Sequence, residues 1–309
     1  MTARHTRPAD GESLAPGTAT ADVHTHTKRS DGVLEPVELV RQAHAAGVRL
    51  FAIADHDNLA AYRELTAPGA DPLPDGLELV PAVEINAVTR RLGLDLPEGE
   101  LHILGIGVDP DDDAFEAAIA TQRGARRHRF AATVVRLREL GLGIDAHLPA
   151  DIMERDDALG RPTLARALIE AGHAGSVDDA FRRILGHGQP GYMPRTGLDP
   201  VEAIRAIRAA GGLASVAHFP EAPSRLPLLR ELVAQGLDGL ETHHRSFDPE
   251  TIASMEAAAT LLGLVQTGGT DYHGDYGSYA ESHAGLVMPG RLVESLRTAL
   301  RAKRGARTS

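Results

Sequence analysis

The sequence predicts an α/β fold in which strands and helices alternate to build a parallel sheet or barrel. Two observations support this. Short apolar runs typical of buried strands alternate with segments that carry apolar residues at helical spacing. Most of the strand-like runs also end in polar residues, as strands do where a parallel sheet carries a ligand site. The length of 309 residues suits one large domain, or one domain with an insertion.

The first group of predicted elements lies before residue 110. A helix is predicted over 35–48, because Pro36 suits a first helical turn and Gly47 suits a helix end. Strand-like runs occur at 21–27, 49–57, 77–86 and 101–109. The second of these is apolar along most of its length, which is typical of a strand buried on both faces.

A second group of elements follows residue 198, where a helix precedes a strand three times. Helices are predicted at 199–212, 226–236 and 248–263, and strands at 213–219, 237–244 and 264–273. Between the two groups no strand is predicted, and helices are expected at 111–141, 161–172 and 176–186. We therefore expect a sheet domain made of residues 21–109 and 198–309, a helical insertion at 110–197, and a disordered tail at 1–20.

Composition narrows the class of protein. The chain contains no cysteine, so disulfides and thiolate metal sites are excluded, and any metal site must use His, Asp or Glu. A net charge of −11 and an aromatic content of 4% argue against a stable nucleic-acid complex. No run is apolar enough for a membrane span, and the first 20 residues hold no signal-peptide run. We expect a cytoplasmic protein, whose oligomeric state stays open.

Metal-binding side chains stand at the ends of nearly all predicted strands. They are His24, His26, Asp31, Asp55, His56, Asp57, Glu84, His102, His218, Glu241, His243, His244, Asp271 and His273. One such residue alone is usually a hydrogen-bonded polar side chain or a helix cap. Many of them on successive strands predict a common site, because clustered carboxylates and imidazoles would otherwise shift one another's pKa values. Divalent cations accept both kinds of ligand.

Six motifs occur in an order that resembles a known family: DVHTHTKRSDG, IADHD, AVEIN, LHILGIGV, SVAHF and TDYHG. They look like the successive motifs of the PHP family, named after polymerase and histidinol phosphatase, and the likeness extends from residue 21 to about 300. The resemblance implies a distorted (β/α)7-type barrel with a helical insertion. It also implies three divalent metal ions at the mouth of the barrel. We expect Mn²⁺, with Fe²⁺ or Zn²⁺ as alternatives, because His, Asp and Glu ligands accept all three.

The same resemblance implies nine metal ligands. His24, His26 and Asp271 would hold the first ion, Glu84 would bridge the first and second, His102 and His218 would complete the second, and Asp31, His56 and His273 would hold the third. Such a site suits hydrolysis of a phosphate ester by a metal-bridging hydroxide. A proton for the leaving group would come from His244, His243, Asp57 or a metal-bound water, and the sequence leaves this choice open.

Arginines in the predicted insertion are candidate phosphate ligands. Arg126 and Arg129 lie three positions apart on one helix face, Arg161 precedes a proline at a helix start, and Arg195 stands near the return to the sheet. Arg245, in the segment ETHHRSF next to His243 and His244, could also reach a phosphate and is a further catalytic candidate. The competing interpretation is a solvated, charged helix face.

The segment GRPTLARALIEAGHAGSVDDAFRRILGHGQPGYMP resembles a PHP subgroup that acts on nucleotides, although Thr163 replaces the histidine usual in that motif. The implied substrate is a 3′,5′-nucleoside bisphosphate or the 5′ end of a short oligonucleotide. One alternative is another small monoester or cyclic ester, such as a sugar phosphate or histidinol phosphate. A second alternative, from another class, is a metal-binding PHP module without catalytic activity.

Overall fold

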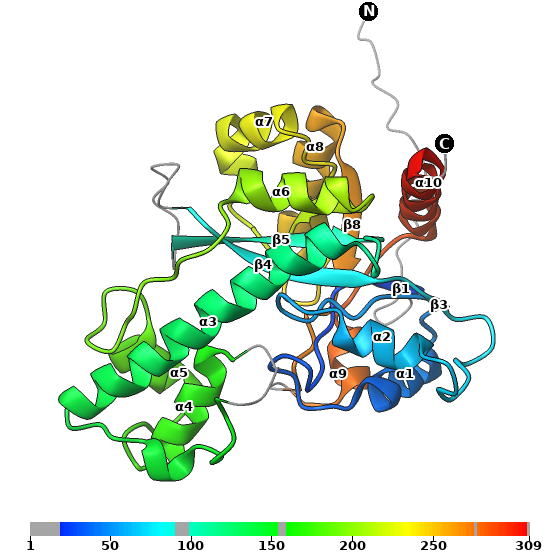
Figure 1. Ribbon diagram of the computed structural model, residues 1–309. Helices are drawn as coiled ribbons and strands as arrows, with labels where there is room; N and C mark the ends of the chain where they lie inside the picture. Colours follow the sequence, from blue (N-terminus) through cyan, green and yellow to red (C-terminus); the bar gives the residue numbers. More distant parts are fainter. Residues whose placement is uncertain (1–18, 90–98, 154–158, 275–276, 308–309) are drawn as a thin grey trace, which may run out of the picture.

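A computed structural model describes residues 19–89, 99–153, 159–274 and 277–307, and its fold mixes α-helices and β-strands (Figure 1). Residues 1–18, most of the predicted tail, lie outside the described residues. The end of that tail belongs to the fold, because Ala19 is buried and the carbonyl of Thr20 accepts a hydrogen bond from the backbone of Leu50. Ordered structure therefore begins before residue 21.

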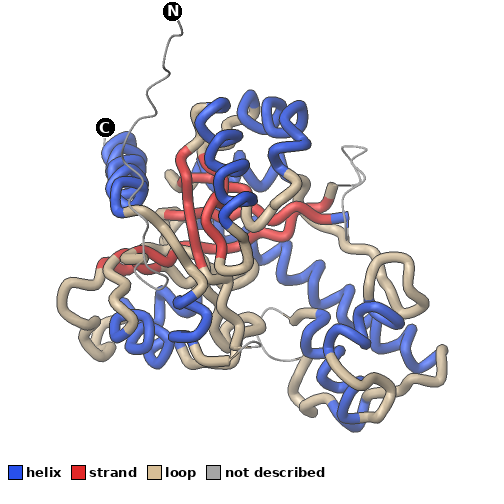
Figure 2. Tube along the Cα trace, turned by 180° about the vertical axis from the view of Figure 1, so that it is seen from behind, coloured by secondary structure: helices blue, strands red, loops and turns tan. Residues whose placement is uncertain are grey.

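The strands form two sheets. The first is parallel and contains, in order, β1 (Ala21–Asp22), β2 (Leu50–Phe51) and β3 (Glu78–Leu79). The second contains, in order, β4 (Ala82–Val88), β5 (Glu100–Ile106), β6 (Leu213–Val216), β7 (Gly239–His244) and β8 (Val265–Gly269). Figure 2 shows the strands gathered in one part of the molecule with helices around them.

β5 departs from the predicted parallel pattern. It is antiparallel to β4 and to β6, and Leu104 pairs with Glu84 on one side and with Ser215 on the other. The β6–β7 and β7–β8 pairs are parallel, as the helix–strand repeats predict. A parallel crossover needs roughly a dozen or more connecting residues, and the link from Val88 to Glu100 is shorter. The chain therefore turns back beside its own strand.

Backbone hydrogen bonds connect the two sheets at both sides. The N–H of Val23 donates to the carbonyl of Gly268 at 3.2 Å, which joins the end of β1 to β8. The N–H of Asp57 donates to the carbonyl of Glu84 at 3.0 Å, which joins the segment after β2 to β4. The predicted α/β class is confirmed. The finer prediction was a (β/α)7-type barrel. The strands pair regularly within two separate sheets, so this pairing does not establish a closed barrel.

Helices cover the sheets and bury an apolar core. They are α1 (Pro36–Ala45), α2 (Ala60–Thr66), α6 (Pro200–Ala209), α7 (Leu226–Ala234), α8 (Pro249–Leu262), α9 (Tyr279–Ala284) and α10 (Gly290–Arg307), with a short 3-10 turn, η5 (Ala222–Arg225). α6, α7 and α8 pack on β4, β5 and β6 in one core cluster, and α10 packs on a second cluster with β1. The sequence reasoning did not predict α2, α9 or α10.

A helical region branches from the sheets (Figure 1). It contains α3 (Asp113–Glu139), η3 (Asp145–His147), α4 (Arg161–Glu170), α5 (Val177–Ala180) and a π-helical turn, η4 (Phe181–Leu185). Its apolar residues form their own cluster, which includes Phe130, Leu137, Leu164 and Leu185. This cluster agrees with a separate insertion, although the division into domains stays a prediction. None of the described helices combines the length and apolar character needed to cross a lipid bilayer.

Candidate metal centre

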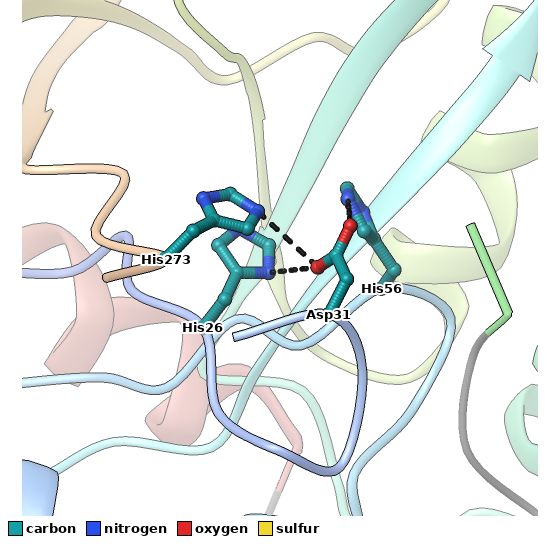
Figure 3. A group of neighbouring side chains, drawn as sticks. All are labelled: His26, Asp31, His56 and His273. Carbon is teal, nitrogen blue, oxygen red and sulfur yellow. Dashed lines mark ion pairs between the residues drawn. The ribbon is translucent and has the colours of Figure 1, made fainter. Parts of the chain in front are cut away.

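The structure brings the nine predicted metal ligands together at the ends of the central strands. Two groups offer ligand atoms that all lie within 4.8 Å of one another: His26, Asp31, His56 and His273, and then His24, Glu84, His218 and Asp271. Figure 3 shows the first group, in which three imidazoles surround the carboxylate of Asp31. Its Oδ1 lies 3.2 Å from Nε2 of His273, and its Oδ2 lies 3.6 Å from Nε2 of His56.

Glu84 lies at the centre of the cluster. Its Oε2 lies 3.4 Å from Nε2 of His24, 3.2 Å from Nε2 of His26 and 3.0 Å from Nδ1 of His56. Its Oε1 lies 2.7 Å from Nδ1 of His102 and 3.2 Å from Nε2 of His218. One buried carboxylate therefore contacts imidazoles from both groups, which is the position that a bridging ligand requires.

His26 contacts both groups. Its Nε2 lies 3.2 Å from Oε2 of Glu84 and 3.3 Å from Oδ1 of Asp271, and Nε2 of His24 lies 3.4 Å from each of the same two oxygens. These distances are compatible with one ion shared by His24, His26 and Asp271, as the resemblance implies, and this assignment stays a prediction. On its other side, Nδ1 of His26 lies 3.9 Å from Oδ1 of Asp31.

The donor atoms fit divalent cations. Six buried ring nitrogens and carboxylate oxygens of the cluster make no hydrogen bond: His24 Nε2, His26 Nε2, Asp31 Oδ1, His56 Nδ1, Glu84 Oε2 and Asp271 Oδ1. Buried polar atoms in folded proteins nearly always have a partner. Imidazole and carboxylate ligands together suit Mn²⁺, Fe²⁺ or Zn²⁺. The arrangement is thus compatible with cations, while their identity and number stay predictions.

Electrostatic shifts show that negative charge dominates the cluster. Burial alone would lower the pKa of His273, but Asp31 and Asp271 outweigh burial and raise it to about 10. At His102, too, burial alone would lower the pKa, but nearby carboxylates, Glu84 foremost, raise it to about 9. Burial prevails at His56, whose pKa falls to about 4 despite its carboxylate neighbours. A region that holds protons this tightly also attracts metal cations.

Buried acidic residues hold the candidate ligands in place. Oε1 of Glu241 lies 3.1 Å from Nδ1 of His24, so it can accept the proton on Nδ1 and leave Nε2 facing the cluster. Its other oxygen accepts the backbone N–H of His218 at 2.7 Å. Asp55 accepts hydrogen bonds from the backbone N–H and the hydroxyl of Thr27, at 2.7 and 2.6 Å. These contacts fix the loops from which the ligands project.

Unusual backbone conformations coincide with the cluster. Among the described residues, the non-glycine positions with positive φ are Asp57 at 52°, His218 at 23° and Asp271 at 48°. Such conformations cost of order 1–3 kcal/mol each and persist where the surroundings enforce them, which is common at functional sites. Gly269 permits another close approach, because a Cβ there would collide with Cβ of His24.

Among the predicted proton donors, His244 faces the cluster. Its Nδ1 lies 2.7 Å from the hydroxyl of Ser246 and accepts the backbone N–H of the same residue at 3.3 Å. Its Nε2 is buried, makes no hydrogen bond and lies 3.9 Å from Oδ2 of Asp271. The carboxylate of Asp57, in contrast, is buried and accepts two hydrogen bonds from Arg126, at 3.1 and 2.9 Å. The Oδ2 of Asp57 is therefore engaged by an arginine, whereas Nε2 of His244 has no such partner among the described residues.

The two remaining candidates near the catalytic end differ in direction: His243 faces α8, while Arg245 lines the cleft beside the cluster. Nε2 of His243 lies 3.7 Å from the carboxylate of Glu256 in α8, and burial lowers the pKa of His243 to about 4. The guanidinium of Arg245 donates to the hydroxyl of Ser282 at 2.9 Å. Arg245 lines a cleft of about 870 Å³ that also contains His244, Asp271 and His273.

The predicted phosphate-binding arginines divide into two sets. Arg126 donates to Asp57 and Asn86, and it is buried. The other three converge on one carboxylate, that of Glu100, and are Arg129 at 3.1 Å, Arg161 at 3.9 Å and Arg195 at 3.0 Å. Sequence reasoning missed Glu100. The signal that could have revealed it is its place two residues before His102, the same spacing as in the His24–His26 pair.

One cavity is lined both by the cluster and by three of the four predicted arginines. Its volume is about 230 Å³, and its lining includes His56, Glu84, His102, His218, Asp271 and His273 together with Glu100, Arg126, Arg161 and Arg195, while Arg129 lines a narrow adjoining space. Asp31 and Pro162 also line it and the larger cleft of about 870 Å³. A ligand with two anionic groups could therefore contact the cluster and the arginines together.

No family model matches the chain, but similar proteins are found, and the names of the following three refer to enzymes that act on phosphate esters. The chain is 30% identical over 256 residues to a 5′-3′ exoribonuclease of Haemophilus influenzae, covering 82% of this chain and 89% of that protein. It is 27% identical over 263 residues to a 3′,5′-nucleoside bisphosphate phosphatase of Chromobacterium violaceum, covering 82% and 87%. A solved structure assigned as a metal-dependent phosphoesterase of Bifidobacterium adolescentis is 30% identical, with a TM-score of 0.75 and coverage of 92% and 97%.

Proposed function

The chain belongs to the PHP family of metal-dependent phosphoesterases, and from this premise we propose that it hydrolyses a phosphate ester of a small nucleotide. The preferred substrate is a 3′,5′-nucleoside bisphosphate. The observation that carries this choice is the single cavity lined by both the His/carboxylate cluster and the arginines. A substrate with two phosphates fits both walls, whereas a simple monophosphate leaves one wall without an anion.

In this proposal the cluster holds three divalent ions, with Mn²⁺ preferred. Such ions neutralise phosphoryl oxygens and lower the pKa of water from about 15.7 to about 7. Glu84 provides both carboxylate oxygens at the centre, while Glu241 keeps Nε2 of His24 directed inward. The protein thus supplies a rigid, buried set of ligands, so little reorganisation is needed when the phosphate arrives.

His244 is the proposed proton donor to the leaving group. Because its Nδ1 accepts the backbone N–H of Ser246, we assign the transferable proton to Nε2, and the hydroxyl of Ser246 then also donates to Nδ1. That atom is buried beside Asp271 and lines the larger cleft. An alkoxide leaving toward this cleft can take the proton there. Arg245, in the same cleft, would contact the leaving part of the substrate.

The second phosphate would be bound by Arg129, Arg161 and Arg195. Arg129 and Arg195 are buried, and Arg161 stands at the N-terminus of α4, where backbone N–H groups also attract anions. Arginine binds phosphate in a fork geometry that favours this contact. Arg126 fits a supporting role better, since its guanidinium is engaged by Asp57 and Asn86.

A second candidate substrate is the 5′ end of a short oligonucleotide. The cleft of about 870 Å³ beside the cluster favours it, because it offers room beyond a single nucleotide. Its lining includes Arg166 and the exposed side chains of Val33 and Val177, a cationic and two apolar groups that suit phosphates and bases. The similar protein of Haemophilus influenzae carries an exoribonuclease name.

Two finer statements on architecture belong to the same proposal. The hydrogen bonds between β1 and β8, and between the segment after β2 and β4, support a distorted (β/α)7-type barrel with β3 at its side. The separate core around Phe130 and Leu164 supports a helical insertion at 110–197 in a domain made of 21–109 and 198–309.

The test is a phosphate-release screen with nucleoside 3′,5′-bisphosphates, short 5′-phosphorylated oligonucleotides, sugar phosphates and histidinol phosphate. We expect the bisphosphate to give the highest kcat/KM, EDTA to abolish turnover, and Mn²⁺ to restore it best. His56→Ala should remove activity as well, because it removes one ligand of the first group. Turnover unaffected by exhaustive chelation would refute the metal-dependent reaction. Absence of turnover on every ester, despite bound metal, would favour a non-catalytic module.

A further inference from the structure

Glu100 is a buried carboxylate that the reaction just described does not use. It opens β5, and its side chain is 2% exposed. Since side chains two apart on a strand share a face, Glu100 lies beside His102, with Oε2 of Glu100 3.7 Å from Nε2 of His102. The carboxylate therefore stands between the candidate metal cluster and the helical region.

Both oxygens of Glu100 contact arginines. Oε1 accepts a hydrogen bond from Nη1 of Arg129 at 3.1 Å and lies 3.9 Å from Nη2 of Arg161. Oε2 lies 3.0 Å from Nε of Arg195. These arginines come from α3, from the start of α4 and from the segment that follows η4. One side chain thus ties three separate segments to the strand that carries His102.

Arg129 shows what this arrangement achieves. Its Nε donates to the carbonyl of Met193 at 2.7 Å, and its Nη1 donates to Glu100, so the guanidinium is held from two sides. Its Nη2 is buried and makes no hydrogen bond. Arg129 lines a narrow space of about 10 Å³ together with Arg161 and Arg195, which also line the cavity of about 230 Å³ beside the cluster. One oxygen of an anion in that cavity, reaching into the narrow space, would supply the missing acceptor.

We propose that Glu100 is a positioning residue that sets the selectivity for a second substrate phosphate. It holds Arg129 and Arg195 at a fixed place relative to the cluster, so that a substrate with two suitably spaced phosphates contacts both. The proposal rests on the proposed function, because it assumes a phosphate in the arginine pocket. Glu100 acts through the arginines and does not touch the phosphate itself, since two anions repel.

The test compares Glu100→Gln with wild type. Glutamine keeps the size of the side chain and one acceptor oxygen, and it removes the charge that holds two guanidiniums. We expect the ratio of kcat/KM for a nucleoside 3′,5′-bisphosphate to that for an aryl monophosphate to fall about tenfold or more, mainly through KM for the bisphosphate. Bound metal, measured by elemental analysis, should match wild type. If Glu100→Gln does not fold, Glu100→Asp, with a retracted carboxylate, carries the same expectation.

Two further variants make the result decisive. Glu116→Gln is the matched control, because Glu116 also bridges two arginines, Arg63 and Arg123, at 2.7 Å each, but lines neither cavity. It should leave the ratio unchanged. Arg129→Ala tests the pocket itself: if this variant loses the preference and Glu100→Gln keeps it, the proposal for Glu100 is overturned and the proposed function stands. If Arg129→Ala keeps the preference, the second-phosphate pocket of the proposed function is itself wrong.

The double variant Glu100→Gln/Arg129→Ala separates positioning from an independent effect. A residue that acts through Arg129 should add little once Arg129 is gone, so the two losses of selectivity should sum to more than the loss in the double variant. Full additivity would contradict the proposal.

Discussion

His244 illustrates how a single residue acquires a role from its hydrogen bonds. The sequence left His243, His244 and Asp57 as equal candidates for the proton donor, because all three stand at strand ends. In the fold, an irregularity in the pairing of β7 between Glu241 and His243 breaks the alternation, so that His243 faces α8 while His244 faces the cluster on the same side as Glu241. Asp57 is engaged by Arg126. The distinction depends on side-chain direction and on partners that lie far away in the chain.

We predict that His244→Ala lowers kcat on a nucleotide substrate by about 10² to 10⁴. An aryl phosphate should lose much less, because its leaving group departs without a proton. The measurement is kcat on both substrates at saturating Mn²⁺, with His128→Ala, on the exposed face of α3, as the control. Equal losses on both substrates would assign His244 to the metal cluster rather than to proton transfer.

At the scale of elements, α3 is the helix that connects the two parts of the molecule. In the first half of α3, Oε1 of Gln122 accepts the backbone N–H of Leu198 at 2.8 Å, and Arg126 forms an ion pair with Asp57. Its second half contributes Phe130 and Leu137 to the helical core. The helix was predicted from its length and spacing. Its docking to the sheets was not, since it depends on buried polar contacts that no local pattern reveals.

We predict that Arg126→Ala destabilises the protein by about 3–5 kcal/mol, because removing one partner leaves the buried carboxylate of Asp57 without its counter-charge. Urea unfolding followed by circular dichroism measures this. Arg136→Ala, on the same helix but 43% exposed, should change stability by less than about 1 kcal/mol. If Arg126→Ala is as stable as wild type but no longer binds substrate, Arg126 is a phosphate ligand, as the sequence first predicted.

Other elements show the limits of sequence patterns. α2 has only seven residues, and α9 has six, so neither provides enough turns for a clear helical period. β1, β2 and β3 have two regular residues each, although strand-like runs several residues longer were predicted there. In those runs the chain leaves regular pairing to present ligands, as at His24 and His26, so local propensity yields to the site.

For the whole molecule, the dominant feature is a buried collection of carboxylates and imidazoles that must be neutralised by protons or by cations. Asp31, Glu84 and Asp271 all have pKa values well below the usual range, because nearby histidines outweigh the effect of burial. Metal ions bind the folded chain and not the unfolded one, so they stabilise it by mass action. Stability, metal binding and pH are therefore linked.

We predict that the chelated protein is most stable near the ordinary histidine pKa of about 6.5. The raised pKa values of His102, about 9, and His273, about 10, contribute stability below pH 6.5 that is lost as pH rises through 9 to 10. The lowered value of His56, about 4, costs stability as pH falls below 6.5. Melting temperatures in EDTA should trace this maximum.

Added Mn²⁺ should raise the melting temperature increasingly between pH 6.5 and 9, since protons and cations compete for the same nitrogens. The measurement is thermal unfolding at matched ionic strength, with and without Mn²⁺. A metal effect that is independent of pH, or a melting temperature in EDTA that keeps rising above pH 7, would contradict the linkage.

The sequence alone determined the class of fold, the family resemblance and the residue types of the candidate centre, because spacing within a strand and the order of motifs are local properties. It could not reveal that β5 runs antiparallel, that Arg126 pairs with Asp57, or that Glu100 gathers three arginines. Those features were decided by the tertiary structure, since each depends on which side chains meet across distant segments and on how buried charges find partners.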